Sequence, residues 1–246
     1  MGARAKRSEL WQAAAGLLLR ADCLCCGRLV GLDSELHSAG AAVNGQLCED
    51  CGAQLQQQWV RADPPVLAVP VFAAGAYGGV RRALILAMKE RLRPAAFVVA
   101  ARVLEAGIIH LAGRAVVPDP RWGEVVLVPA PSRRQAARRR GGDVVSRMCH
   151  LVAERNAGVQ VFDVAYMQES ARDSVGLNRA ERRANVSANI RVLRPAVREL
   201  LRVSSESARV VIVDDVCTTG ATIAQFATVL RANGVTVAAA LVLASA

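Results

Sequence analysis

The sequence predicts an α/β protein in which helices flank an open parallel sheet, preceded by a small cysteine-rich module. Short valine-rich runs alternate with longer segments whose apolar residues recur at helical spacing, as in a doubly wound sheet. Five of the seven cysteines lie before residue 52, outside that alternation. The 246 residues are enough for one α/β domain of ordinary size and one small appendage.

The first 62 residues are expected to form the cysteine-rich module. A helix is expected over residues 8–20, ahead of the first cysteines. Asp63-Pro64-Pro65 then interrupts regular structure, because proline lacks a backbone N–H and fixes its own φ. We therefore place the boundary there, with the module at 1–62 and the α/β domain at 63–246.

Strands and helices are expected in turn along the α/β domain. The expected strands, short β-branched runs, cover residues 66–74, 124–128, 161–165, 210–213 and 235–243. The expected helices are one that carries Arg81, Arg82 and Lys89, and others over residues 94–113, from the arginine-rich run to about 155, and 221–232. Residues 168–189 are polar around Gly176, which is typical of a loop that closes over a site or of an exposed linker helix.

Two apolar stretches lack the features of membrane segments. Residues 94–113 carry Arg102 and Glu105 near their middle, and their apolar positions recur at helical spacing, so we expect a buried amphipathic helix. The apolar run at 13–19 is short, charged residues close it, and no small-x-small cleavage site follows. We expect a cytoplasmic protein that does not insert into membranes.

Four cysteines are spaced as two Cys-x-x-Cys pairs, with residues 27–47 between the pairs: Cys23, Cys26, Cys48 and Cys51. Two such pairs offer four thiolates to one tetrahedral ion and leave no open position for catalysis, which predicts a structural zinc ion. Cys25 is a spare thiol that could replace a neighbour, and His37 is a weaker ligand candidate. The alternative is a set of buried or disulfide-bonded cysteines, although disulfides are rare in the cytosol.

The most specific local pattern lies at residues 210–222. Four apolar β-branched residues predict a buried strand, which two carboxylates, Asp214 and Asp215, are expected to end. Ligands of open parallel sheets bind beyond the carboxyl ends of the strands. The next residues lead into a helix and offer hydroxyl and backbone N–H groups, which suit a phosphate. Carboxylates and phosphate donors together indicate a ligand with a diol and a phosphate, such as ribose 5-phosphate; the alternative is an ordinary buried strand with a capped turn.

This pattern resembles the motif that binds phosphoribosyl pyrophosphate (PRPP) in type I phosphoribosyltransferases. The resemblance implies a PRPP–Mg²⁺ site in which Asp214 and Asp215 hold the ribose hydroxyls and stabilise the cationic sugar. The PRPP contacts that it implies are Val216, Cys217, Thr218, Thr219, Gly220, Ala221 and Thr222 in one loop, and Ala130, Pro131, Ser132 and Arg133 in another. It also implies a flexible loop at 171–185 that excludes water, with Arg172 contacting the leaving pyrophosphate.

The order of motifs along the whole chain is similar to that of the ComF family. The cysteine module comes first, followed by Tyr77-Gly78, Lys89, Val-Pro-Ala-Pro at 128–131, Arg-Arg-Arg-Gly at 138–141 and the PRPP motif. The family usually continues its arginine-glycine pair with Phe-Asn-Gln, where this chain has Gly-Asp-Val at 142–144. The resemblance implies a phosphoribosyltransferase that transfers or senses phosphoribosyl groups and is linked to natural competence and DNA uptake.

The formal net charge of +10 suits polyanionic partners. The alternative function is therefore that of a non-catalytic protein on a phosphoribosyltransferase fold, either a single-stranded-DNA-binding protein or an adaptor. The expected partner is PRPP, with single-stranded DNA and a helicase or other uptake-machinery protein as further candidates. Aromatic residues that could stack on bases are few and scattered, which favours the enzyme.

Overall fold

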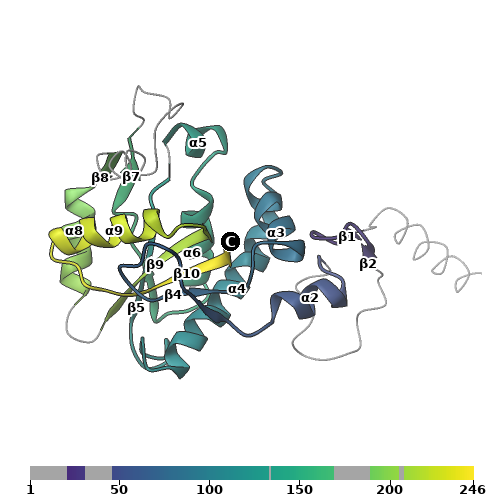
Figure 1. Cartoon of the computed structure of the whole chain (residues 1–246), viewed down its shortest axis with the longest axis horizontal. Helices are drawn as coiled ribbons and strands as arrows, with labels where there is room; N and C mark the ends of the chain where they lie inside the picture. The colour runs from purple at the N-terminus through teal and green to yellow at the C-terminus, as the bar shows by residue number, and fades with distance from the viewer. Residues whose placement is uncertain (1–20, 31–45, 133, 169–188, 205–207) are drawn as a thin grey trace, which may run out of the picture.

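The computed structural model describes residues 21–30, 46–132, 134–168, 189–204 and 208–246 (Figure 1). Its main sheet contains β3 (Val60–Ala62), β4 (Val71–Ala73), β5 (Val125–Pro129), β6 (Val159–Val161), β9 (Arg209–Cys217) and β10 (Val237–Ser245). The strand order is β3-β4-β10-β9-β5-β6, and all neighbours are parallel except β3 and β4. This mostly parallel sheet confirms the α/β fold that the sequence predicted.

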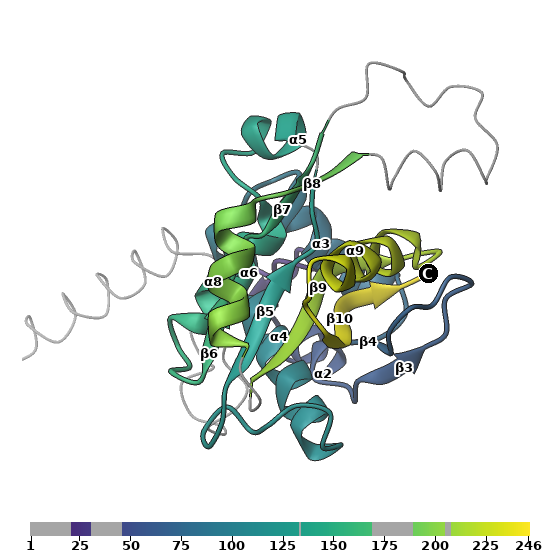
Figure 2. The same ribbon diagram turned by 90° about the vertical axis from the view of Figure 1, so that its left-hand side faces the viewer.

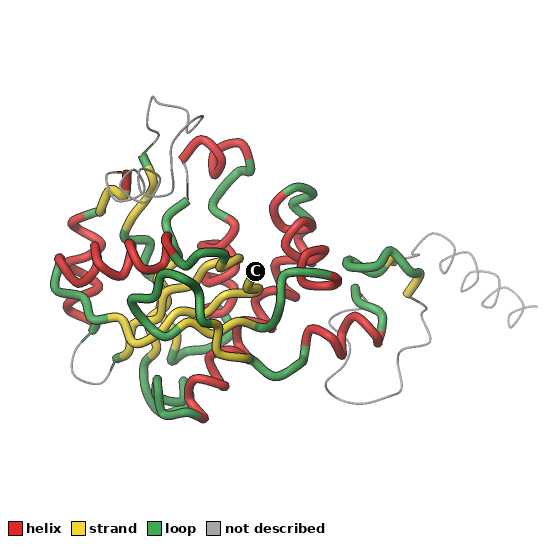
Figure 3. Tube along the Cα trace, viewed as in Figure 1, coloured by secondary structure: helices red, strands yellow, loops and turns green. Residues whose placement is uncertain are grey.

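Helices cover both faces of this sheet, as the tube in Figure 3 and the turned view in Figure 2 show. The helices are α2 (Glu49–Leu55), α3 (Gly79–Lys89), α4 (Pro94–Gly113), α5 (Arg134–Arg139), α6 (Val144–Ala153), α8 (Arg194–Val203) and α9 (Ala221–Ala232). Alternate residues of β9 enter opposite cores: Val211 and Val213 pack with α3, α4 and α6, whereas Val210 and Ile212 pack with α8 and α9. The sheet is therefore doubly wound.

The helix α4 has the bounds that the sequence predicted. It begins at Pro94, a residue suited to the first turn of a helix, and Phe97, Leu104 and Leu111 are buried. Among the described residues, α4 is the one helix whose length and composition would allow it to cross a membrane, and its mean hydropathy is 1.7. Because it packs against α3, α6 and β10, the expectation of a buried helix is confirmed.

The prediction that the two carboxylates end their strand was wrong. The strand β9 continues to Cys217, and β10 accompanies it, pairing Asp214 with Val242 and Cys217 with Ser245. On the other side, β5 stops pairing with β9 at Val213. The last residues of β9 therefore have a strand on one side only, because β5 is shorter.

Other boundaries also differ from the sequence-based expectation. Only residues 71–73 of the expected strand 66–74 form β4. The expected strand 161–165 is divided between β6 and β7 (Ala165–Met167), and β7 pairs with β8 (Ile190–Val192) in a separate antiparallel ribbon. The polar stretch 169–188 and the expected helix at 8–20 lie outside the described residues.

The cysteine module packs against the sheet domain through α3 (Figure 1). It contains a short antiparallel ribbon, β1 (Ala21–Asp22) with β2 (Leu29–Val30), followed by α2. Leu24 and Leu55 belong to the same apolar core as α3 and α4, and the main sheet already begins at Val60. The division at residue 62 stays a prediction, and the two parts share one core.

Candidate functional site

The topology of the sheet places a switch point at its carboxyl edge. The strands β5 and β9 are neighbours, but β5 leads to α6 on one face and β9 leads to α9 on the other. Ligands of open α/β sheets bind at such a switch point, because the two loops diverge there and leave room between them. The segments that follow β5 and β9, both predicted from the sequence to bind ligand, therefore meet at the switch point.

The two carboxylates of β9 lie in different surroundings. The side chain of Asp215 is 8% exposed and forms an ion pair with Lys89, the last residue of α3. Asp214 is half-buried, and its Oδ1 accepts a hydrogen bond from the backbone N–H of Asp215 at 2.8 Å. Asp215 is thus already neutralised within the protein, whereas no ion pair joins Asp214 to another described residue.

Burial and the neighbouring charge of Asp215 raise the pKa of Asp214 to about 7. The hydrogen bond from Asp215 and the positive charge of Lys89 act in the opposite direction, and Asp143 adds a smaller rise. The charge on this carboxyl group therefore changes near neutral pH. A ligand that donates hydroxyl hydrogen bonds or brings positive charge would favour its ionised form.

The loop after β9 presents polar groups to the carboxyl edge. Thr218 and Thr219 are exposed, and Gly220 adopts the left-handed conformation, with φ +74°, directly before α9. The hydroxyl of Thr219 accepts from the backbone N–H of Ala221 at 3.4 Å, and the first turn of α9 carries no acidic residue. A helix N-terminus of this kind favours an anion, and the phosphate site that the sequence predicts here stays a prediction.

The loop after β9 is supported by Pro64 and Val66, which the sequence predicted to be part of a link and the start of a strand. The backbone N–H of Val66 donates to the carbonyl oxygen of Thr219 at 3.0 Å. A Cβ atom added to Gly220 would lie 2.2 Å from the carbonyl oxygen of Val66 and 2.8 Å from the ring of Pro64. The Asp63-Pro-Pro65 stretch and Val66 therefore fix the path of the loop, and only glycine fits at 220.

The loop after β5 has fewer backbone donors for a ligand than its sequence suggested. Ala130 is buried and donates its N–H to the carbonyl oxygen of Val213 at 2.7 Å, while Pro131 has no N–H. Ser132 is half-buried, and its carbonyl oxygen accepts from Met167 at 3.0 Å. A contact from this loop to an anion would come from Ser132 or from residue 133. Arg133 and Arg172 both lie outside the described residues.

Lys89 was not among the site residues predicted from the sequence. Its helix was predicted, but a lysine at the end of an amphipathic helix is usually a solvated residue that complements the helix dipole. Nothing local indicates that its side chain reaches a strand more than a hundred positions later in the chain. Only the packing of α3 against the sheet reveals the contact.

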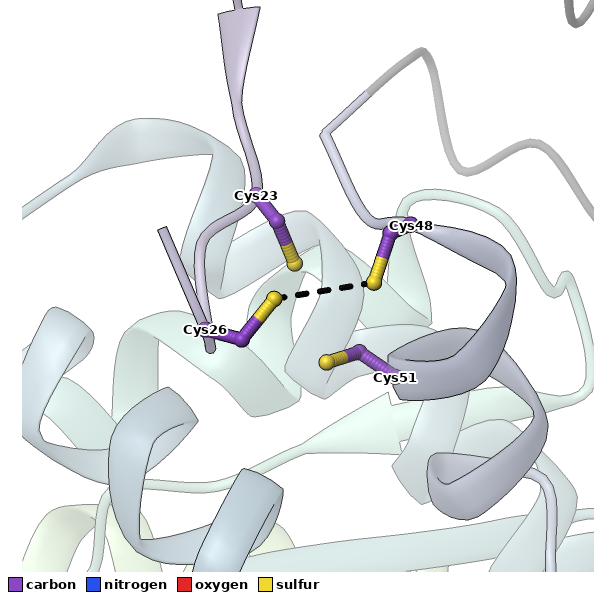
Figure 4. A group of neighbouring side chains, drawn as sticks. All are labelled: Cys23, Cys26, Cys48 and Cys51. Carbon is purple, nitrogen blue, oxygen red and sulfur yellow. Dashed lines mark hydrogen bonds between the residues drawn. The ribbon is translucent and has the colours of Figure 1, made fainter. Parts of the chain in front are cut away.

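The four predicted zinc ligands meet in one cluster (Figure 4). The Sγ atoms of Cys23, Cys26, Cys48 and Cys51 all lie within 4.8 Å of one another, and those of Cys26 and Cys48 are 3.6 Å apart. Four thiolates around a tetrahedral zinc ion stand about 3.8 Å apart, given a Zn–S bond of about 2.3 Å. The cluster could therefore hold a zinc ion with little rearrangement.

Local structure explains why these four cysteines converge. Gly27, with φ +74°, turns the chain between β1 and β2, and its N–H donates to the carbonyl oxygen of Cys23 at 3.0 Å. Cys48 precedes α2, and Cys51 lies in its first turn. An exposed ion pair of 2.8 Å between Arg28 and Asp50 joins the two halves.

Cys25 lies outside this group of four. Burial, followed by the charges of Cys23, Cys26 and Cys48, raises the pKa of Cys25 to about 12, which keeps its thiol neutral. For Cys23, burial acts upward, but hydrogen bonds from neighbouring backbone groups lower its pKa to about 6. The thiol of Cys23 therefore ionises more readily than that of Cys25. His37 lies outside the described residues.

Comparison with known proteins adds little to these observations. No protein family matches the chain, and no curated protein matches it. Among solved structures, the chain is similar to a mutant hypoxanthine phosphoribosyltransferase from Trypanosoma cruzi in a ternary complex with substrates. The TM-score is 0.29 at 16% identity, over 59% of this chain and 68% of the other. Likeness at this level carries no weight for function, which must be inferred from the residues of the site.

Proposed function

We propose that the chain binds PRPP with Mg²⁺ in the crevice between β5 and β9 and transfers or senses phosphoribosyl groups. The observation that carries the proposal is the arrangement of the segment 214–222. Within nine residues it combines two carboxylates near the end of β9, two exposed threonines and the N-terminus of α9, next to the switch point of the sheet. A ribose 5-phosphate has the complementary groups, a diol and a phosphate.

Each part of the segment has its own role in this proposal. Asp214 and Asp215 accept hydrogen bonds from the 2- and 3-hydroxyls of the ribose, and their charge stabilises the cationic sugar as the C1–O bond breaks. The hydroxyls of Thr218 and Thr219 and the first N–H groups of α9 hold the 5-phosphate. Binding energy from this phosphate, remote from C1, then positions the reacting carbon.

Magnesium suits this crevice, because carboxylate and hydroxyl oxygens are the hard donors that it prefers. The ion would be held chiefly by the pyrophosphate and hydroxyl oxygens of PRPP itself, and would supply positive charge to the departing pyrophosphate. Zinc has a separate role in the proposal: the four-cysteine cluster would hold it as a structural ion.

The direct test is calorimetric titration of the protein with PRPP and Mg²⁺. We expect saturable binding by the native chain and a loss of at least about 100-fold in the Asp214→Asn, Asp215→Asn double variant, because two charge-assisted hydrogen bonds are removed. Glu199→Gln, an exposed charge loss on α8, is the matched control and should bind normally. Equal PRPP affinity in the double variant and the native chain would refute the proposal.

Competence, DNA uptake and a helicase partner enter only through the resemblance to ComF. One observation favours a second role in binding nucleic acid: Arg194, Arg198 and Arg202 are exposed at four-residue spacing on α8. A basic stripe of this kind can contact a phosphate backbone. Fluorescence anisotropy with a labelled single-stranded oligonucleotide should show salt-dependent binding that the triple arginine-to-glutamine variant loses. The absence of any binding at about 150 mM salt would eliminate this role.

A further inference from the structure

Lys89 makes the closest contact that any described cation makes with the carboxylates of the crevice. Its ammonium group pairs with Oδ2 of Asp215, and the two side chains are 29% and 8% exposed. The contact joins the end of α3 to β9 across the carboxyl edge of the sheet. A carboxylate so little exposed needs a partner for its charge, since an unpaired buried charge is strongly destabilising.

The helix α3 holds Lys89 at this position through its buried face. Leu84, Ile85 and Met88 are at most 2% exposed and belong to the core shared with α4. Beyond the lysine, Glu90 donates its N–H to the carbonyl oxygen of Leu86 at 2.9 Å, and its side chain lies 3.7 Å from the guanidinium group of Arg140. The lysine backbone is therefore anchored on both sides, and its side chain extends from a fixed point.

Charged and titratable groups meet here from every element around the pair. β9 contributes Asp214 and Asp215, with the thiol of Cys217 close to Asp214. Asp143, whose carboxylate caps α6, lies close enough to act on Asp214, and α3 contributes Lys89. Among the described residues, Asp214 and Asp215 thus lie beside one ammonium group, that of Lys89. Removing that group would leave their mutual repulsion unopposed.

We infer that Lys89 is a positioning residue of the ligand site, whose ammonium group pairs with Asp215 and offsets its negative charge beside Asp214. The inference rests on the proposed function and names the group on which that function depends at neutral pH. A carboxylate has acceptor capacity on both oxygens, and the ion pair with Lys89 is made at Oδ2 of Asp215. Lys89 acts through Asp215 and needs no contact with the ligand.

The distinguishing measurement is the titration of the ligand-free protein. Carbon-13 NMR of labelled aspartate carboxyl groups, followed against pH, should show the titration of Asp214. In Lys89→Met, which keeps the apolar part of the side chain, we expect the midpoint of this titration to rise by about one pH unit or more. In Lys89→Arg the midpoint should stay close to that of the native chain. Arg82→Met, which removes a charge from the exposed face of α3, should leave the midpoint unchanged. An unchanged titration in Lys89→Met would overturn the inference.

Binding of PRPP and Mg²⁺ tests the consequence for the ligand. We expect Lys89→Met to bind about tenfold more weakly than the native chain near pH 6 and almost equally near pH 9, where Asp214 is ionised in both. A loss that is the same at both pH values would overturn the inference. If the native chain bound no PRPP at any pH while the NMR shift was present, the proposed function would fail and the ionising role of Lys89 would stand.

Stability provides a second measurement in case Lys89→Met folds poorly. The double variant Lys89→Met, Asp215→Asn removes both members of the pair, so no charge is left uncompensated. We expect its urea midpoint to lie above that of Lys89→Met alone. A double variant that is no more stable than Lys89→Met would show that the ammonium group does not act on Asp215, which overturns the inference.

Discussion

Replacing Gly220 with alanine is expected to lower the free energy of unfolding by about 3–6 kcal/mol. Two features of the structure contribute. The φ of +74° is unfavourable for a residue with a side chain, and the new Cβ would lie 2.2 Å from the carbonyl oxygen of Val66. A backbone atom cannot move aside as a flexible side chain can, so the loop or the 63–66 segment must shift.

The magnitude follows from three contributions. The left-handed conformation costs alanine about 1–2 kcal/mol. Overpacking against Val66 and Pro64 costs about 1–3 kcal/mol, and weakening the hydrogen bond from Val66 to Thr219 costs about 1 kcal/mol. Because Thr219 belongs to the proposed phosphate site, the same shift is expected to weaken PRPP binding.

Urea unfolding of the variant and of a matched control measures this difference. Gly234 also has a positive φ, +85°, but a Cβ there would meet only the side chain of Leu201, at 3.7 Å. Gly234→Ala should therefore lose only the conformational contribution, about 1–2 kcal/mol. If Gly220→Ala were no less stable than Gly234→Ala, the close approach of Val66 to the loop would be refuted.

Three further predictions concern the metal cluster, the acid pair and the contact between the two parts of the chain. Elemental analysis of the native chain is expected to find about one zinc ion. Cys51→Ser should lower both the zinc content and the Tm, whereas Cys25→Ser should leave the zinc content unchanged. The raised pKa of Asp214, caused by burial and then by Asp215, means that stability falls as pH rises from about 4 through 7, because the folded state holds the proton more tightly. Asp214→Asn has no such proton, so its unfolding free energy should exceed that of the native chain by about 1–4 kcal/mol near pH 8 and by much less near pH 5. An equal difference at both pH values would contradict the raised pKa of Asp214. Gly107→Ala should cost about 1–3 kcal/mol and change tryptophan fluorescence, since its Cβ would lie 2.6 Å from the ring of Trp59.

Several parts of the structure follow from the sequence because their signals are local. The apolar periodicity of 94–113 and the proline at its start predict α4, and the glycine before Ala221 predicts where α9 begins. The Cys-x-x-Cys spacing predicts the four thiols that converge, since each pair forms its own tight turn or helix start. By contrast, α8 was not predicted, because it lies among arginines and next to a long polar stretch.

What the sequence determined about the candidate site is the chemistry of the segment 214–222: two carboxylates, two hydroxyls and a glycine before a helix. The tertiary structure decided how these groups are placed. It extended β9 past the carboxylates because β10 runs alongside, and it set β5 next to β9 so that their loops diverge. It also brought Lys89 to Asp215 and Val66 to Gly220. These contacts join residues far apart in the chain, and they depend on how helices pack on a sheet, which periodicity and spacing do not encode.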